Sequence, residues 1–254
     1  MPITDAARRN RAKLFSDLVS PLADTDPELI ELFDNWAFDD VLAESGPDSK
    51  TRLMLQLAAI IACQAVNVYR VMLGAALEVG VTPIEVKEIV YQAVPYVGMA
   101  RVFDFLGVTN AVLQERGIPL PLEGQSTTTR DTRFDKGVVA QKRIFGGEHV
   151  EKMHADAPKD QRHIQAFLSA NCFGDYYTRN SLDLKTRELL TFVLLTAFGG
   201  CDPQVAAHAR GNLAVGNDRN VLLGAVTQLL PYIGYPRALN AIRAINEATR
   251  DHAS

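Results

Sequence analysis

The sequence predicts an all-α protein made of two tandem helical-bundle repeats that pack together. Three observations support this fold class. The chain contains an internal repeat, and residues 50–63 and 185–198 are apolar on most sides, as buried helices are. No segment alternates apolar and polar residues with β-branched enrichment, and no Asn-Gly or Asp-Gly hairpin signal occurs.

The internal repeat consists of short blocks that recur in the same order. FDD at 38–40 recurs as FGD at 173–175, and DSKTR at 48–52 recurs as DLKTR at 183–187 with the same spacing. QAVPYVG at 92–98 then recurs as QLLPYIG at 228–234, with the spacing longer by one residue. One small gap between ordered blocks indicates duplication rather than chance.

The repeat sets the expected domain boundaries. We predict a first repeat over 1–116, a linker over 117–134 and a second repeat over 135–254. The linker is rich in Pro, Gly, Ser and Thr, a composition typical of an extended connection. Each repeat is expected to be a bundle of about five or six helices.

Helix boundaries can be placed from local signals. Thr82 can cap a helix whose first residue is Pro83, and Glu85 can complete a capping box. In both QxxPYxG blocks the proline comes near the end of a helix, and Gly98 and Gly234 mark the following turns.

Charge and composition exclude several classes of partner. There are 26 basic and 30 acidic residues, a net charge of −4, whereas nucleic-acid and anionic-membrane surfaces need a basic balance. The longest apolar runs, 53–63 and 189–198, are shorter than the roughly 20 residues that a membrane span needs. The N-terminus is charged and lacks the apolar core of a secretory signal, so a cytoplasmic location is expected.

Cysteine and histidine spacing argues against a metal site. The cysteines are Cys63, Cys172 and Cys201, with no Cys-x-x-Cys pair, so neither a disulfide framework nor a zinc cage is expected. The remaining histidines do not share a helix face and are not expected to bind metal; they are His149, His154, His163 and His252.

The second repeat resembles a known family. The blocks that carry the resemblance are FGDYYTR at 173–179, LDLKTRELL at 182–190, His208, and QLLPYIGYPRA at 228–238. Together they resemble the carboxymuconolactone decarboxylase family, which includes alkylhydroperoxidase D. The resemblance implies an all-helical, two-copy member that acts on a small molecule without a cofactor and assembles as a trimer of two-repeat chains.

The resemblance singles out Glu188, Cys201 and His208 as candidate catalytic residues. The peroxidase branch of the family pairs a glutamate with Cys-x-x-Cys and a histidine three residues later. Here Cys201 matches the first cysteine, but Gln204 replaces the second, so a disulfide cannot resolve the oxidised thiol. A one-cysteine peroxidase stays open if the following helix or His208 lowers the thiol pKa.

The decarboxylase branch assigns the chemistry to proton transfer. His208 would act as general acid or base with Glu188 as its partner, on a small lactone, keto acid or related carbonyl compound. In a straight antiparallel hairpin the two residues lie several ångströms apart in height. They meet only if the helices cross steeply, or if the other repeat or another subunit supplies one of them.

Candidate substrate-binding residues are Tyr232 as a pocket wall and Arg187 or Arg237 as a carboxylate ligand, with packing and salt bridging as the alternatives. The first repeat has Leu53 and Met72 at the positions of Glu188 and His208, so we predict that it is structural. A non-catalytic binding or assembly protein stays open as a third function, because a fold does not specify an activity.

Overall fold

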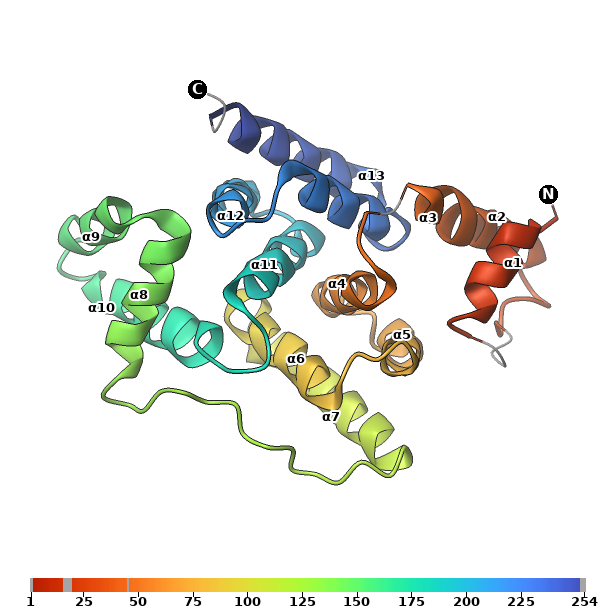
Figure 1. Ribbon diagram of the computed structural model, residues 1–254, viewed down its shortest axis with the longest axis horizontal. Coiled ribbons are helices and arrows are strands. Elements are labelled where there is room, and N and C mark those ends of the chain that lie inside the picture. The colour runs from red at the N-terminus through yellow and green to blue at the C-terminus, as the bar shows by residue number, and fades with distance from the viewer. Residues whose placement is uncertain (1, 16–19, 45, 252–254) are drawn as a thin grey trace.

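The computed structural model describes residues 2–15, 20–44 and 46–251, and every regular element in these ranges is a helix (Figure 1). The all-α prediction is therefore confirmed. The first repeat contains α1 (Asp5–Ala12), α2 (Pro27–Asn35), the π-helical η1 (Trp36–Asp40), α3 (Val41–Ala43), α4 (Ser49–Ala62), α5 (Val66–Glu78), α6 (Pro83–Val97) and α7 (Met99–Glu115). The second contains α8 (Arg133–Phe145), α9 (Gly147–Ala155), α10 (Arg162–Phe167), the π-helical η2 (Leu168–Tyr177), α11 (Leu184–Phe198), α12 (Asp202–Ala214) and α13 (Arg219–Asp251).

The two repeats have the same order of elements. Helices α4, α5, α6 and α7 correspond to α11, α12 and the two parts of α13, and the FDD and FGD blocks both lie in π-helical segments. Gly98 separates α6 from α7 with φ +85°, and Gly234 interrupts α13 with φ +72°. Both glycines occupy a left-handed region that other residues rarely adopt, so both predicted turns are confirmed.

Side-chain caps begin three helices, of which the sequence predicts the one at α6. Asp48 accepts a hydrogen bond from the Thr51 amide at the start of α4, and Asp183 accepts one from the Thr186 amide at the start of α11. At α6 the Thr82–Glu85 capping box is complete, because both of its reciprocal hydrogen bonds form. The repeated DxKTR motif therefore has a structural role as a helix start.

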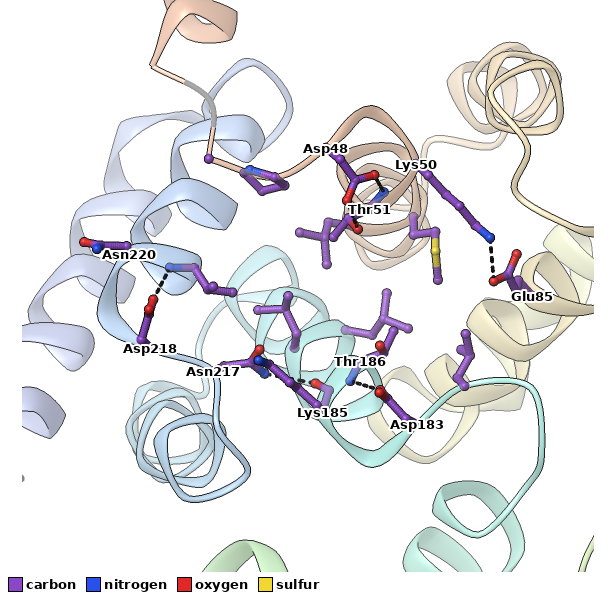
Figure 2. Close-up of a pocket in the computed structure, with 18 of the residues that line it drawn as sticks. Asp48, Lys50, Thr51, Glu85, Asp183, Lys185, Thr186, Asn217, Asp218 and Asn220 are labelled. Carbon is purple, nitrogen blue, oxygen red and sulfur yellow. Dashed lines mark hydrogen bonds and ion pairs between the residues drawn. The ribbon is translucent and has the colours of Figure 1, made fainter.

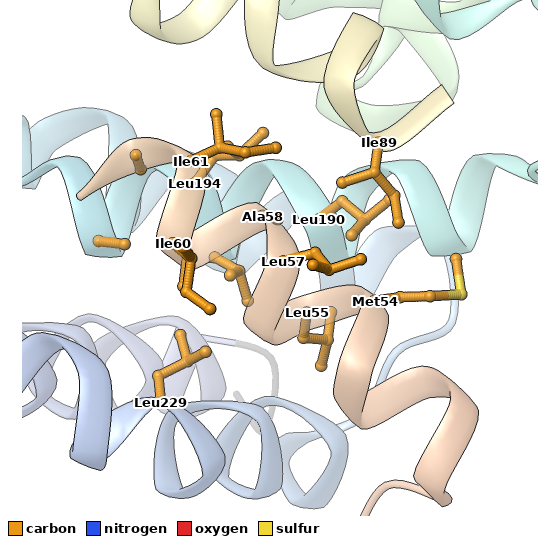
Figure 3. Packing of buried hydrophobic residues seen from close by; sticks show 14 of the residues in the cluster. Met54, Leu55, Leu57, Ala58, Ile60, Ile61, Ile89, Leu190, Leu194 and Leu229 are labelled. Atoms are coloured by element: carbon orange, nitrogen blue, oxygen red, sulfur yellow. The ribbon is translucent and has the colours of Figure 1, made fainter. Parts of the chain in front are cut away.

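The core is centred on α4 and α11, which lie against each other. Every residue over 52–62 of α4 and over 187–197 of α11 is buried (Figure 3). Each flanking helix packs on both of them: α6 contacts α4 and α11, and α13 contacts α11 and α4. In Figure 3, Ile89 of α6 lies near Leu190 of α11, and Leu229 of α13 lies near Ile60 of α4. Each repeat therefore completes the core of the other.

The connection between α7 and α8 is non-helical over 117–132. It runs along the second repeat, where the Asn180 amide donates to the carbonyl of Gln125 and the Thr127 hydroxyl donates to the carbonyl of Thr178. None of the helices in the described ranges has the length and apolar character of a membrane span.

Candidate active site

Glu188 and His208 form a buried pair between α11 and α12. The imidazole Nδ1 of His208 lies 2.5 Å from Oε1 of Glu188, and the two residues are 7% and 0% exposed. The Gly199–Gly200 turn, with φ +75° and +71°, reverses the chain between their helices. The two side chains thus meet within one chain, with no contribution from another subunit.

Close approach of the two helices explains how Glu188 and His208 meet. Gly211 lies on α12 one turn after His208, and a Cβ atom there would lie 2.5 Å from Oε1 of Glu188. Asn212 binds both helices, because its Nδ2 donates to the carbonyls of Glu188 (3.1 Å) and His208 (2.7 Å). A glycine and an asparagine therefore let the carboxylate lie against α12, within reach of the imidazole.

Two tyrosines extend the pair into a hydrogen-bonded chain. The Tyr177 hydroxyl donates to Oε2 of Glu188 at 2.9 Å, and the Tyr96 hydroxyl donates to that of Tyr177 at 2.9 Å. Because Glu188 accepts from Tyr177, the same arrangement favours Nδ1 of His208 as a donor to its other oxygen. Nε2 of His208 is then the nitrogen that can exchange a proton with a substrate.

Burial keeps both tyrosines protonated. Loss of solvation raises the pKa of Tyr177 well above its usual value, and the charge of Glu188 raises it further. Burial likewise raises the pKa of Tyr96, followed by the charges of Cys172, Tyr177 and Glu188. The two hydroxyls thus remain donors at neutral pH and hold the carboxylate in place.

Aromatic rings border the imidazole. The ring of Phe145, the last residue of α8, lies edge-to-face with His208 at 5.3 Å between centroids. The ring of Tyr96 does so at 5.7 Å, and it comes from α6 of the first repeat. The first repeat therefore contributes a side chain to the candidate site, although its own counterparts of Glu188 and His208 are Leu53 and Met72.

Cys201 is not part of this arrangement. Its thiol donates to the carbonyl of Leu195 at 3.3 Å, and it lines a cavity of about 150 Å³ with Thr196 and Arg237. Burial raises the pKa of the Cys201 thiol, and the charge of Asp202 raises it further. A one-cysteine peroxidase needs the opposite shift, so the geometry does not favour that hypothesis.

Arg187 is completely buried and binds protein groups. Its guanidinium donates to Oε2 of Glu88 at 2.8 Å and to Oε1 of Gln92 at 3.0 Å, both on α6 of the first repeat. Arg179 binds the same Glu88 carboxylate at 2.9 Å. This cluster joins the two repeats and engages the Arg187 guanidinium with protein groups.

Tyr232 and Arg237 lie away from the Glu188–His208 pair. The Tyr232 hydroxyl lies 3.8 Å from Sδ of Met72, in the first repeat's counterpart of the candidate site. The guanidinium of Arg237 donates to the carbonyl of Ala197 at 2.5 Å and contacts Sγ of Cys63 at 3.6 Å. Their contacts are those of packing residues, and it is Tyr96 of α6, rather than the expected Tyr232, that lies beside His208.

A cavity lies between the two repeats, and His208 is not among the residues that line it (Figure 2). It has a volume of about 670 Å³ and is lined by the starts of α4, α11 and α13. Asp48 and Asp183 are engaged as helix caps, and Lys50 forms an ion pair with Glu85 at 2.9 Å. These four charged side chains are thus engaged by other protein groups.

Metal ligands do not cluster in the parts of the chain that the structure describes. No group of three or more His, Cys, Asp or Glu side chains within 2–15, 20–44 and 46–251 could hold an ion. His154 instead hydrogen-bonds Ser169 at 2.9 Å, and His252 lies outside the described residues.

Tyr96 and Tyr177 are site residues that spacing alone does not identify. Tyr177 lies in the FGDYYTR block, and Tyr96 recurs as Tyr232, so both have equally good explanations as packing residues. The sequence distinguishes Tyr96 in one respect: it belongs to the repeat that lacks counterparts of Glu188 and His208. Its place depends on α6 packing on α11 of the second repeat as well as on α4 of its own, a contact that a single sequence does not reveal.

The chain matches the model of the carboxymuconolactone decarboxylase family twice, over residues 27–111 and 162–247. The chain belongs to the carboxymuconolactone decarboxylase family. The two matches fall within the two repeats, so the two-copy organisation is confirmed.

Two family relatives have names that describe decarboxylases. The chain is 24% identical over 121 residues to the 4-carboxymuconolactone decarboxylase of Acinetobacter baylyi, covering 48% of this chain and 90% of the relative. It is 27% identical over 118 residues to the nitrosuccinic acid decarboxylase of Metarhizium robertsii, covering 46% of this chain and 82% of the relative. Each of these relatives is therefore about as long as one repeat.

A solved structure has the same fold over the full length. It is a protein of Burkholderia xenovorans whose name is that of a gamma-carboxymuconolactone decarboxylase subunit. The TM-score is 0.54 at 22% identity, and the match covers 100% of both chains. This likeness supports the two-repeat fold.

Proposed function

We propose that this protein is a decarboxylase of small carboxylic acids in which His208 transfers the proton that accompanies loss of CO₂. The observation that carries the proposal is the buried Glu188–His208 pair at 2.5 Å, which commits Nδ1 and leaves Nε2 for a substrate. A histidine whose second nitrogen binds a carboxylate has its tautomer and orientation fixed, as proton transfer requires.

The reaction separates into two balanced steps. The bond between the carboxylate and its neighbouring carbon breaks, CO₂ leaves, and the electron pair passes into an adjacent carbonyl or lactone group as an enolate. Protonated His208 then gives its Nε2 proton to that carbon, and a proton from solvent restores the imidazolium. Glu188 stabilises the imidazolium while it is charged. Since the carbonyl takes the electron pair and His208 supplies the proton, we propose that no cofactor takes part.

The substrate class follows from this chemistry. The acid must carry an electron-withdrawing group next to the carbon that loses CO₂, which suits a small lactone, keto acid or related carbonyl compound. The names of the two relatives, which describe decarboxylases of organic acids, support this class. The aromatic rings of Tyr96 and Phe145 beside His208 suit a small, flat molecule.

The test is release of CO₂ from 4-carboxymuconolactone and from a β-keto acid by the purified protein. In D₂O the product should carry deuterium at the carbon that lost CO₂. His208→Ala should lower kcat by about 10²- to 10⁴-fold, the usual contribution of a positioned acid or base. Glu188→Gln should lower kcat in the same direction.

A matched control is His154→Ala, which removes another imidazole from the second repeat, one that hydrogen-bonds Ser169. It should leave turnover unchanged. Wild-type turnover by His208→Ala would overturn the proposal. If no acid is turned over, and His208→Ala changes no other activity, the remaining hypothesis is a non-catalytic binding or assembly protein.

We also propose that the chain assembles as a trimer in the cytoplasm. Large apolar side chains remain exposed on the single chain, including Phe103 (66%), Leu239 (60%) and Phe167 (59%), and a subunit interface would cover such residues. Light scattering in solution should then give a mass about three times 27.9 kDa. A mass of one chain would contradict the trimer.

A further inference from the structure

The imidazole of His208 is closed off by aromatic walls on the described chain. His208 is 7% exposed. The rings of Tyr96 and Phe145 lie 5.7 and 5.3 Å from its imidazole, measured between centroids, and a substrate must pass them to reach Nε2. A closed site that acts on a diffusing acid needs a wall that moves.

Tyr96 is the fixed wall of the two. It lies inside α6, its hydroxyl donates to Tyr177, and it accepts a contact from the Cys172 thiol at 3.5 Å. Moving Tyr96 would break the chain of hydrogen bonds that ends on Glu188.

Phe145 is the wall that can move. Its ring has no polar atom to anchor it and packs edge-to-face on His208 and on Phe173, at 5.3 and 5.9 Å between centroids. Phe145 is half-buried and is the last residue of α8. Gly146 follows with φ +88°, and neither Gly146 nor Gly147 has a neighbouring atom within 4 Å of an added Cβ. The joint between α8 and α9 therefore has open space around it, and glycine allows its backbone to rotate.

The position of Phe145 places it between the site and solvent. Its inner edge faces His208 at 5.3 Å, and its ring lies 6.4 Å from that of His149, which is exposed on α9. Rotation of the Phe145 side chain away from His208 would join the imidazole to solvent on this side.

We propose that Phe145 is the gate of the His208 site and sets the size of the acid that reaches Nε2. The role of Phe145 in setting the size of the acid rests on the proposed function, whereas its role as a gate requires only that it control access to His208. The two can therefore be tested separately.

Access is measured by the rate at which diethylpyrocarbonate modifies His208, followed by mass spectrometry of the peptide that contains it. Exposed His163 serves as the reference within each sample. Phe145→Ala should raise the His208 rate by about tenfold relative to His163, because modification follows the open fraction of the site. Phe145→Leu, which preserves more of the packing, should give a smaller rise.

The chain offers a matched control on the same helix. Phe134 on α8 lies 5.7 Å from the ring of His154, so Phe134→Ala removes an equivalent phenylalanine–histidine contact elsewhere. It should raise the modification rate of His154 and leave that of His208 unchanged. Circular dichroism of each variant checks that the helices are intact.

The gate is overturned if His208 in the wild-type protein reacts as fast as His163, or if neither Phe145 variant raises its rate while the fold is intact. The effect of Phe145 on substrate size is tested by comparing the turnover of a small and a bulky keto acid. Phe145→Ala should raise the bulky-to-small ratio of kcat/KM by about tenfold. A faster His208 reaction without decarboxylation would support the gate and contradict the proposed function.

Discussion

Tyr96 and Tyr232 occupy the same position in the two repeats, and each lies in the site of the other repeat. Tyr96 of the first repeat lies edge-to-face with His208 at 5.7 Å. Tyr232 of the second repeat lies 3.8 Å from Sδ of Met72, the first-repeat counterpart of His208. The two positions are related by the repeat, but Tyr96 lies beside the buried Glu188–His208 pair and Tyr232 does not.

This relationship predicts different results for the same substitution. Tyr96→Phe keeps the ring beside His208 and removes the hydrogen bond to Tyr177, which should cost about 1 kcal/mol of stability. If that energy is also lost from the transition state, kcat should fall about fivefold, because 1.36 kcal/mol corresponds to tenfold. Tyr232→Phe is the control and should leave kcat unchanged. Equal effects of the two variants on kcat would contradict a specific role for Tyr96.

Gly211 should not accept a side chain. A Cβ there would lie 2.5 Å from Oε1 of Glu188 and 2.7 Å from Cγ2 of Ile144. Gly211→Ala should therefore destabilise the protein by about 1–3 kcal/mol and displace the carboxylate from His208. Gly107→Ala in α7, where nothing lies within 4 Å, should instead stabilise by about 0.5–1 kcal/mol. Urea denaturation of both variants gives the comparison, and a stable Gly211→Ala protein would contradict the close approach.

Arg187 should affect stability rather than substrate affinity. Its guanidinium is buried against Glu88 at 2.8 Å, and burial lowers its pKa. Arg187→Met leaves that carboxylate short of a buried partner, so a loss of about 3–5 kcal/mol is expected in urea denaturation. Lys185→Met, at an exposed position two residues earlier, should change stability by less than about 0.5 kcal/mol. A raised KM at unchanged stability would instead support Arg187 as a substrate ligand.

The thiols should react slowly at neutral pH and faster as the pH rises. Burial raises the pKa of Cys172 to about 12 and also raises that of Cys201. A raised pKa means a smaller thiolate fraction than free cysteine at any pH below it, so iodoacetamide should alkylate both residues more slowly than free cysteine at pH 7. Cys201 is less buried and should react before Cys172. Alkylation of Cys201 faster than free cysteine at pH 7 would revive the peroxidase hypothesis.

Local features of the fold were predictable because they depend on neighbouring residues. The Thr82–Glu85 capping box and the turns at Gly98 and Gly234 need only a few consecutive side chains or a backbone conformation that glycine favours. The tandem organisation was visible because blocks recur in order. The family resemblance likewise pointed to Glu188 and His208, which the structure places in contact.

The arrangement around the site was not predictable from spacing. A straight hairpin separates Glu188 from His208, and only the absence of a side chain at Gly211 shows how the helices come close enough. Tyr96 reaches the site because α6 packs on α11 of the other repeat as well as on α4, a long-range contact that the similarity of the two repeats conceals. Repeats that look alike give no sign of which copy of an element is the neighbour.

The contact of Tyr96 in the first repeat with His208 in the second also changes how the site depends on protein concentration. In a single-copy chain with this packing, a second subunit would have to contribute the tyrosine, and the site would lose it when dilution dissociates the subunits. Here the segment at 117–132 joins the repeat that contains Tyr96 to the repeat that contains His208, so both residues are present in every molecule. The first repeat, with Leu53 and Met72 at the positions of Glu188 and His208, therefore supplies Tyr96 to the candidate site although it lacks the polar pair itself.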